Sequence, residues 1–251
     1  DMEMHMIGAM YAPNDNVTFM VMLPYLKTTM DHRGMMPMPS GTFFTTETEG
    51  VGDVNLSALL PLYDYKGGIM HATLGVSVPT GSIDETGVTP MSMGSEVQLP
   101  YAMQLGSGTV DLRPNITWAK YNAGWSWGAQ GSATIRTGNR NDRGYKLGNA
   151  VDAQGWVAWN PQQSVSLSAR LKWSAWKNIK GADADLNPMM VPTADTNRRA
   201  GRRTDAHIGM NWVSKGGHRL ALEYGVPVQQ HLDGPQLETD SITTAGYQYA
   251  F

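Results

Sequence analysis

The sequence predicts an all-β fold, a transmembrane antiparallel up-and-down β-barrel formed by residues 1–251 as a single domain. Three observations predict it. Apolar residues recur with a period of two over segments of about ten residues. The connections between these segments alternate between short and long, and Trp and Tyr lie near the segment ends, as in the aromatic girdles of membrane barrels. Strands of globular proteins are shorter, usually ~5–6 residues.

The period of two is clearest between Val165 and Trp173. One face of this segment carries Val165, Leu167, Ala169, Leu171 and Trp173, and the other carries Ser166, Ser168, Arg170 and Lys172. The same pattern along the chain predicts eleven strands, at about residues 1–12, 17–29, 50–63, 69–79, 108–120, 125–138, 147–160, 165–178, 204–214, 218–228 and 240–251.

The connections separate the two ends of the expected barrel. The short ones are rich in Pro, Asn, Asp and Gly, and cover residues 13–16, 64–68, 121–124, 161–164 and 215–217. The long ones are polar and cover residues 30–49, 79–106, 138–146, 178–203 and 229–240. Outer-membrane barrels have short periplasmic turns and longer extracellular loops, whereas a soluble sandwich has no reason to sort its loops by length.

The parity of the strands leads to a further expectation. Single-chain bacterial barrels have an even number of strands, with both termini on the periplasmic side. Eleven strands place the last residue on that side but leave Asp1 on the extracellular side. We therefore expect one strand before Asp1, which gives twelve in the complete barrel.

Composition excludes several other classes. Charged residues make up 16% of the chain, below the roughly 25% of ordinary soluble proteins. The net charge of −3 gives no reason to expect nucleic acid as a partner. The absence of cysteine excludes disulfides, thiol catalysis and cysteine zinc sites.

Polar side chains on the strand faces opposite the apolar ones are the candidate lumen residues. If they point inward, they fill and solvate the interior, and some could pair across it or tune selectivity. These residues are Asp53, Asn55, Asp111, Arg113, Arg136, Asp152, Arg170, Lys172, Asp205, His207 and Glu223.

Methionine is the second unusual feature, with 17 residues. Met2, Met4, Met6 and Met10 share one strand face, which the sequence alone does not assign to lumen or lipid. His32, Met35, Met36 and Met38 lie in the first long loop and could bind a soft ion such as Cu(I). Methionine also suits a promiscuous hydrophobic passage, or simple packing.

Three prolines interrupt otherwise good strand patterns. Pro24, Pro61 and Pro114 lack the N–H that a ladder bond needs, so each is expected at a bulge, kink or local break. A break could open the wall toward lipid, or it could only adjust curvature.

The sequence offers little support for an enzyme. None of the six His lies in a Gly-x-Ser-x-Gly nucleophile motif, and no His-Glu-x-x-His zinc motif is present. An outer-membrane hydrolase remains an alternative, with an inward Ser near His71 or His207. We expect neither catalytic residues nor a cofactor.

Several segments resemble the outer-membrane channel family associated with meta-pathway phenol degradation, whose suggested role is the transport of hydrophobic compounds. The segments are Gly50–Asn55, Leu74–Asp84, Leu99–Gly108, Asn141–Gly148, Leu186–Ala194 and Leu232–Asp240. The resemblance covers nearly the whole chain and implies a monomeric twelve-stranded channel in the outer membrane of a Gram-negative bacterium. A Met-rich first strand precedes the segment matching Met2–Met10 in that family, which agrees with the parity argument.

The function expected from the residues and the resemblance together is passive uptake of small hydrophobic or amphipathic molecules, including aromatic ones. The expected partners are outer-membrane lipid and the barrel assembly machinery. Tyr247, Tyr249 and the terminal Phe251 resemble the C-terminal signature that this machinery recognises. The alternative from the residues is a soft-metal channel or binding barrel that uses the loop with His32.

Overall fold

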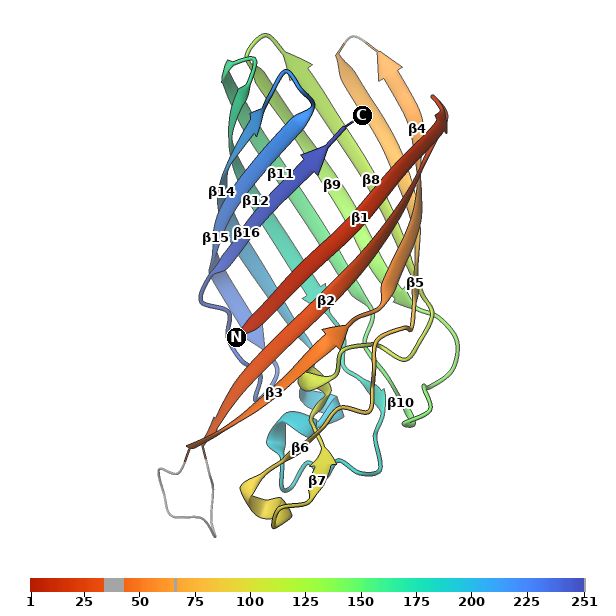
Figure 1. Ribbon diagram of the computed structural model, residues 1–251, viewed down its shortest axis with the longest axis vertical. Coiled ribbons are helices and arrows are strands. Elements are labelled where there is room, and N and C mark those ends of the chain that lie inside the picture. Colours follow the sequence, from red (N-terminus) through yellow and green to blue (C-terminus); the bar gives the residue numbers. More distant parts are fainter. Residues whose placement is uncertain (34–42, 66, 251) are drawn as a thin grey trace.

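The computed structural model describes residues 1–33, 43–65 and 67–250, and the strands form a curled, nearly closed barrel (Figure 1). Around the barrel the order is β1 (Met2–Asn14), β2 (Val17–Arg33), β4 (Val54–Tyr65), β5 (Gly68–Val78), β8 (Asp111–Asn122), β9 (Trp125–Arg136), β11 (Ala150–Gln162), β12 (Val165–Trp176), β14 (Gly201–Val213), β15 (His218–Leu232) and β16 (Ile242–Tyr249). Each strand pairs antiparallel with its sequence neighbour in this order. The predicted fold class and the eleven predicted strands are confirmed.

The first long connection differs from the prediction. We expected a loop over residues 30–49, but β2 continues to Arg33 and β3 (Phe43–Val51) pairs with it. Glu47 and Glu49 alternate with the buried Thr46 and Thr48, so they lie on the outer face of β3, and both contact Lys27. Because β3 is polar on both faces, it lacks the apolar alternation by which the other strands were recognised.

The two ends of the barrel differ as the sequence predicts. The short turns lie at one end, and the long connections gather at the other (Figure 1). We call these the turn end and the loop end. β1 and β16 run in the same direction, and no ladder joins them among the described residues.

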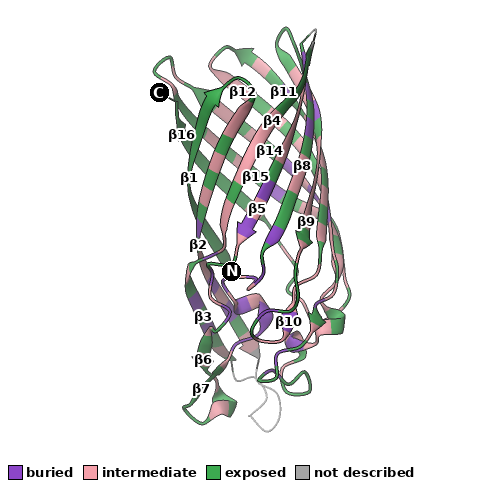
Figure 2. Cartoon of the chain, turned by 90° about the vertical axis from the view of Figure 1, so that its right-hand side faces the viewer, coloured by how far each residue is buried: buried purple, intermediate pink, exposed green. Residues whose placement is uncertain are grey.

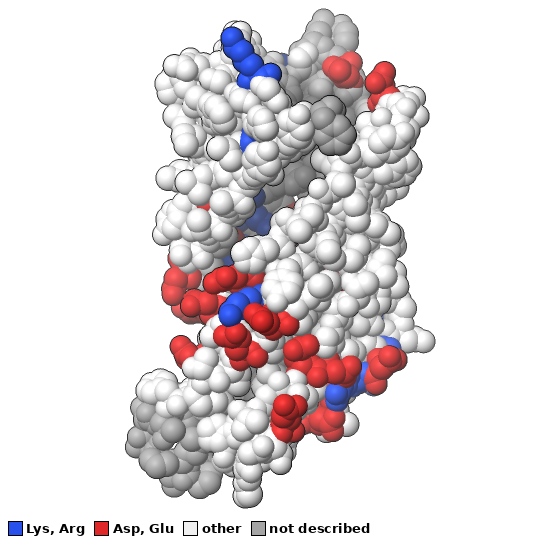
Figure 3. Space-filling model, viewed as in Figure 1, with Lys and Arg blue, Asp and Glu red and all other residues white. Residues whose placement is uncertain are grey.

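The hydrogen-bonded register assigns the two faces of the wall. Residues paired directly share a face, and one such row runs through Met22, Asn55, Ser77, Asp111 and Arg136. This row faces the lumen, since Ser77 and Asp111 are buried. The alternate residues are exposed Leu, Val, Ile, Trp and Tyr. Figure 3 shows the corresponding outer wall almost free of charge between a few charged side chains at the turn end and a band of them toward the loop end.

The long connections pack against one another and form a cap at the loop end. Their elements are short: β6 (Thr86–Val88), η1 (Pro90–Ser92), β7 (Glu96–Gln98), η2 (Tyr101–Met103), β10 (Tyr145–Lys146), β13 (Lys180–Gly181), η3 (Pro192–Ala194) and η4 (Thr196–Arg198). Buried Tyr101, Tyr145, Ile179, Leu186 and Ala194 form a hydrophobic core inside the cap. Figure 2 shows this concentration of buried residues. In the described part of the chain, no helix is long and apolar enough to cross a membrane.

A cluster of ion pairs joins three of the long connections that form the cap. Arg143 lies 2.6 Å from Asp84 and 2.7 Å from Asp185, which belong to two other connections. Nearby, the backbone N–H of Asp183 donates to the Tyr101 hydroxyl at 3.0 Å. The aromatic rings of Tyr101 and Tyr145 meet edge to face, with centroids 4.7 Å apart. The cap is therefore held by apolar burial and by charge pairing between connections.

Asp53 ties the cap to the barrel. It lies in the two-residue gap between β3 and β4, where its carboxylate accepts hydrogen bonds from the Gly81 N–H at 3.0 Å, the Ser107 N–H at 2.9 Å and the Ser107 hydroxyl at 2.6 Å. Gly81 and Gly106 approach so closely that a Cβ on Gly106 would lie 2.2 Å from the Gly81 carbonyl oxygen. One carboxylate thus fixes both ends of the 79–110 connection.

We expect Asp53→Asn to loosen the 79–110 connection. The Asn side chain keeps one oxygen acceptor, but its NH₂ group would face the N–H groups that the carboxylate now accepts from. Hydrogen bonds to a charged group contribute about 1.5–3 kcal/mol each. A Glu-specific protease should therefore cut the variant faster, at Glu85 or Glu96. Asp142→Asn, at an exposed position of the same cap, is the matched control. Equal cleavage rates for wild type and Asp53→Asn would show that the carboxylate does not hold the connection.

The cap should also lose stability at alkaline pH. Burial raises the pKa of Tyr145 to about 12, from ~10 for a free tyrosine. Between these values the folded cap binds a proton that the unfolded cap releases, so stability falls as pH rises through this window. The melting temperature, followed from pH ~9 to ~12, should decline less for Tyr145→Phe than for the wild type. Tyr121→Phe, which alters an exposed ring, should decline as wild type does.

Candidate functional site

The lumen between β11 and β15 contains a connected group of polar side chains. The Arg170 guanidinium pairs with the Glu223 carboxylate, with Nε at 3.1 Å from Oε2, and also donates to Gln154. His207 Nδ1 lies 3.3 Å from Glu223 Oε1. Four neighbouring strands contribute to this group, because Gln154, Arg170, His207 and Glu223 all belong to inward-facing rows.

Glycine on a neighbouring strand lets large lumen side chains lie along the wall. Gly225 is paired with His207, and a Cβ on Gly225 would lie 2.2 Å from His207 Nδ1. Gly128 is paired with Trp156 in the same way, and a Cβ on Gly128 would lie 2.4 Å from the indole ring. The imidazole and the indole therefore cover the glycine backbone instead of projecting across the lumen.

Two further ion pairs lie nearer the loop end. Lys172 is 3.2 Å from Asp152, which also accepts a hydrogen bond of 2.6 Å from the Ser174 hydroxyl. Arg203 is 2.8 Å from Asp205, whose side chain is fully buried. On this polar wall, positive and negative side chains therefore lie next to each other.

A second group of predicted lumen residues lies on β4, β8 and β9. Asp111 is almost fully buried, pairs with Arg136 and accepts a 2.8 Å hydrogen bond from Thr109. Arg113 donates to Asn55 on β4. The structure thus gathers the predicted residues into separate groups. Asp53 stands apart, since it anchors the cap as described above.

Methionine dominates the lumen face of β1 and also occurs on the lumen face of β2, next to the group on β4. Met20 and Met22 are paired on β4 with Ser57 and Asn55, which face the lumen, and on β1 with Met10 and Gly8. The stripe of Met2, Met4, Met6 and Met10 therefore faces the lumen.

The three predicted prolines lie at irregular points of the ladders. At Pro24 the partner of β2 changes from β3 to β4, and the register shifts between Pro61 and Tyr63. Pro114 is paired with β5 but lies in a stretch where β8 and β9 are not paired, although the register on either side is unchanged.

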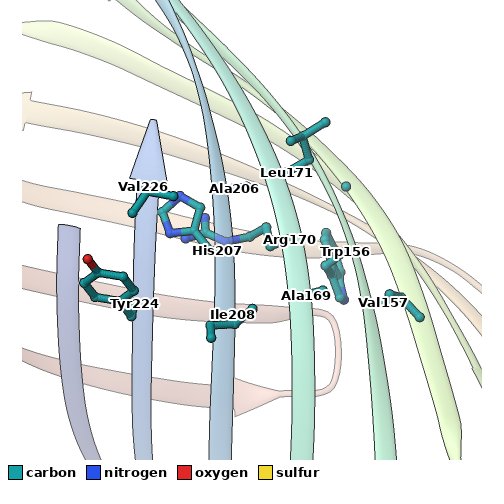
Figure 4. A pocket seen from close by; sticks show the side chains of 11 residues that line it. Trp156, Val157, Ala169, Arg170, Leu171, Ala206, His207, Ile208, Tyr224 and Val226 are labelled. Atoms are coloured by element: carbon teal, nitrogen blue, oxygen red, sulfur yellow. The ribbon is translucent and has the colours of Figure 1, made fainter. Parts of the chain in front are cut away.

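The outer wall behind the central polar group has a shallow apolar recess of about 620 Å³. Its lining includes the exposed residues Leu171, Ile208 and Tyr224, with the smaller Gly155 and Ala169 between them. Figure 4 shows the recess residues, with Arg170 extending toward His207. The recess faces outward, because most of its lining belongs to the outward rows, such as Ala169, Ile208 and Tyr224, although the inward Trp156, Arg170 and His207 also border it.

Of the four residues of the soft-metal alternative, only His32 lies in the described ranges. His32 hydrogen-bonds through Nε2 with the Thr46 hydroxyl at 2.8 Å and stacks on Phe44. Met35, Met36 and Met38 lie outside the described residues. Within the described ranges, no group of three or more His, Asp and Glu side chains could hold a metal ion.

Sequence reasoning missed some residues of the central group. Gln154 and Trp156 alternate with the apolar residues of β11, so period two could have assigned both to the lumen. The role of Gly225 carries no such signal, because it depends on the pairing of β15 with β14.

Comparisons with known proteins agree with this architecture. The crystal structure of an outer-membrane channel from Pseudomonas putida F1 matches with a TM-score of 0.66 and 16% identity, covering 98% of this chain and 81% of that one. The crystal structure of BamA from Haemophilus ducreyi, lacking POTRA domains 1–3, matches with a TM-score of 0.35 and 10% identity, covering 98% and 53%. The second likeness is too low to carry an argument. No curated protein matches the chain.

A protein-family model settles the relationship that the sequence motifs suggested. The model described as "Putative MetA-pathway of phenol degradation" matches residues 3–185, which is more than half of the chain. The resemblance noted in the sequence is therefore confirmed. The chain belongs to this phenol-degradation family, and its barrel has the fold of an outer-membrane channel.

Proposed function

We propose that this protein is a passive channel of the bacterial outer membrane for small hydrophobic or amphipathic molecules, including aromatic ones. The observation that carries the proposal is a lumen with two unlike walls. By strand order, the methionines of β1 and β2 lie across the barrel from β11 and β12, which carry Gln154 and Arg170 of the polar group. No chemical reaction and no cofactor are part of the proposal.

The two walls suit a solute with an apolar body and one polar group. Thioether side chains are apolar and flexible, so they can accommodate rings of different shape. Arg170, Glu223 and Gln154 offer donors and acceptors on the other side. The family description, which refers to phenol degradation, supports an aromatic alcohol as the representative solute.

We propose an axial route through the lumen. Pro24 lies at the largest irregularity of the wall, but Leu105 from the cap packs there, since a Cβ on neighbouring Gly50 or Gly52 would contact Leu105. The ladders through Pro61 and Pro114 resume after each irregularity. A lateral exit at these prolines is the competing route.

The proposal also includes the surroundings of the barrel. The exposed outer residues, such as Leu74, Leu171 and Ile208, are suited to lipid. The barrel is proposed to act as a monomer and to be assembled through its C-terminal signature, of which Phe251 lies outside the described residues.

Permeation of an aromatic alcohol should depend on the apolar character of the methionine wall. In a Gram-negative host without general porins, the protein should raise uptake of radiolabelled benzyl alcohol. Met20→Gln/Met22→Gln should lower that uptake several-fold, because polar amides replace apolar thioethers. Met20→Leu/Met22→Leu should keep it, because Leu is apolar and of similar volume. Uptake no higher than in cells without the protein would overturn the proposed function.

Ion selectivity should depend on the central polar group. In planar bilayers under a salt gradient, Glu223→Gln should shift the reversal potential toward anions, because Arg170 loses its countercharge. Arg170→Gln should shift it toward cations. The double variant restores the balance of charge and should return near the wild-type value. If neither single variant moved the reversal potential of the folded protein, ions would not pass this group and the axial route would be wrong.

A further inference from the structure

The lumen face of β1 carries sulfur at nearly every position, whereas the facing row of β2 (Met20, Met22, Pro24, Leu26 and Thr28) carries it at two of five. The inward residues of β1 from 2 to 10 are four methionines and Gly8, and β2 adds two more methionines. On the opposite face, the same strands carry Ile7, Tyr11, Phe19, Val21 and Leu23, all exposed.

This separation of residue types between the faces is informative. If the lumen needed only apolar surface, the branched and aromatic residues of the lipid face would serve equally well. Thioethers differ from them in being soft ligands, which favour Cu(I) among biological metals. The sorting of methionine to one face therefore indicates a chemical requirement in addition to an apolar one.

The register brings several thioethers together around Gly8. Met10 lies directly opposite Met20, a position in which Cβ atoms are ~4.5–5.5 Å apart. Met22 lies opposite Gly8, and its Sδ is 2.2 Å from where a Gly8 Cβ would be. Gly8 stands midway between Met6 and Met10, so its missing side chain leaves space that the Met22 sulfur enters.

We propose that Met10, Met20 and Met22, with Met6 beside them, form a lumen site for a soft monovalent cation, Cu(I) or Ag(I). Three or four thioethers match the ligand type and number that such a cation accepts, and the flexible side chains can turn their sulfurs toward it. The site is distinct from the loop with His32. It also goes beyond the proposed channel function, since it binds a cation on a wall that otherwise serves apolar solutes.

Ag(I) is the suitable probe, because it needs no reductant. Silver nitrate is titrated into the full chain in detergent, in chloride-free buffer, and binding is followed by calorimetry. We expect one Ag(I) per barrel, with sulfur neighbours in its X-ray absorption spectrum. Met10→Leu/Met20→Leu/Met22→Leu should lose this binding, because Leu keeps the volume and removes the sulfur.

Two further variants make the test specific. Met70→Leu/Met210→Leu alters methionines of the outward face and should bind as wild type does, since Met70 is paired with Trp118 and Met210 with Leu167. Gly8→Ala should weaken binding, because the new Cβ would displace the Met22 sulfur. Heat-dependent migration of the barrel in gels confirms folding of each variant.

The outcomes separate this proposal from the channel function. Absence of Ag(I) binding to the wild-type protein would overturn the proposal, and so would full binding by the folded triple Leu variant. Neither result bears on aromatic uptake, which the Leu substitutions preserve. Loss of aromatic uptake with Ag(I) binding intact would overturn the channel function alone.

Discussion

The antiparallel ladder is the constraint on which the rest of this structure depends. A wall of strands satisfies its backbone N–H and C=O groups only through its neighbours, so each pairing must be held in one register. Because side chains alternate, a slip by one residue would move every lumen side chain to the lipid face. The pairing of Arg170 with His207, and of Met10 with Met20, follows directly from this register.

The cap depends on the same ladder but is stabilised differently. Its connections are polar in overall composition, yet Tyr101, Tyr145 and Leu186 bury one another, and Asp53 binds the cap to the gap between β3 and β4. The gap occurs where Pro24 interrupts the pairing of β2. An irregularity in the wall thus supplies the attachment point for the structure that covers it.

The sequence predicted the fold well and the site only in part. Period two and the sorted loop lengths identified the strands, because both are local properties. β3 was missed because Thr and Glu on its two faces give no apolar alternation. The inward position of Arg170 was predictable from β12 alone, whereas its pairing with Glu223 joins two residues that are 53 positions apart in the chain. The cap core was not predicted, since its apolar residues are scattered over several connections.

The glycines beneath Met22, Trp156 and His207 have a consequence for the width of the lumen. Each glycine acts as a recess into which a bulky neighbour folds, so the bore is set by residues without side chains as much as by large ones. An alanine in any of these positions would turn its neighbour away from the wall and toward the axis. Evolution could therefore narrow or block such a pore by a single methyl group on a glycine, without enlarging any of the bulky residues that line it.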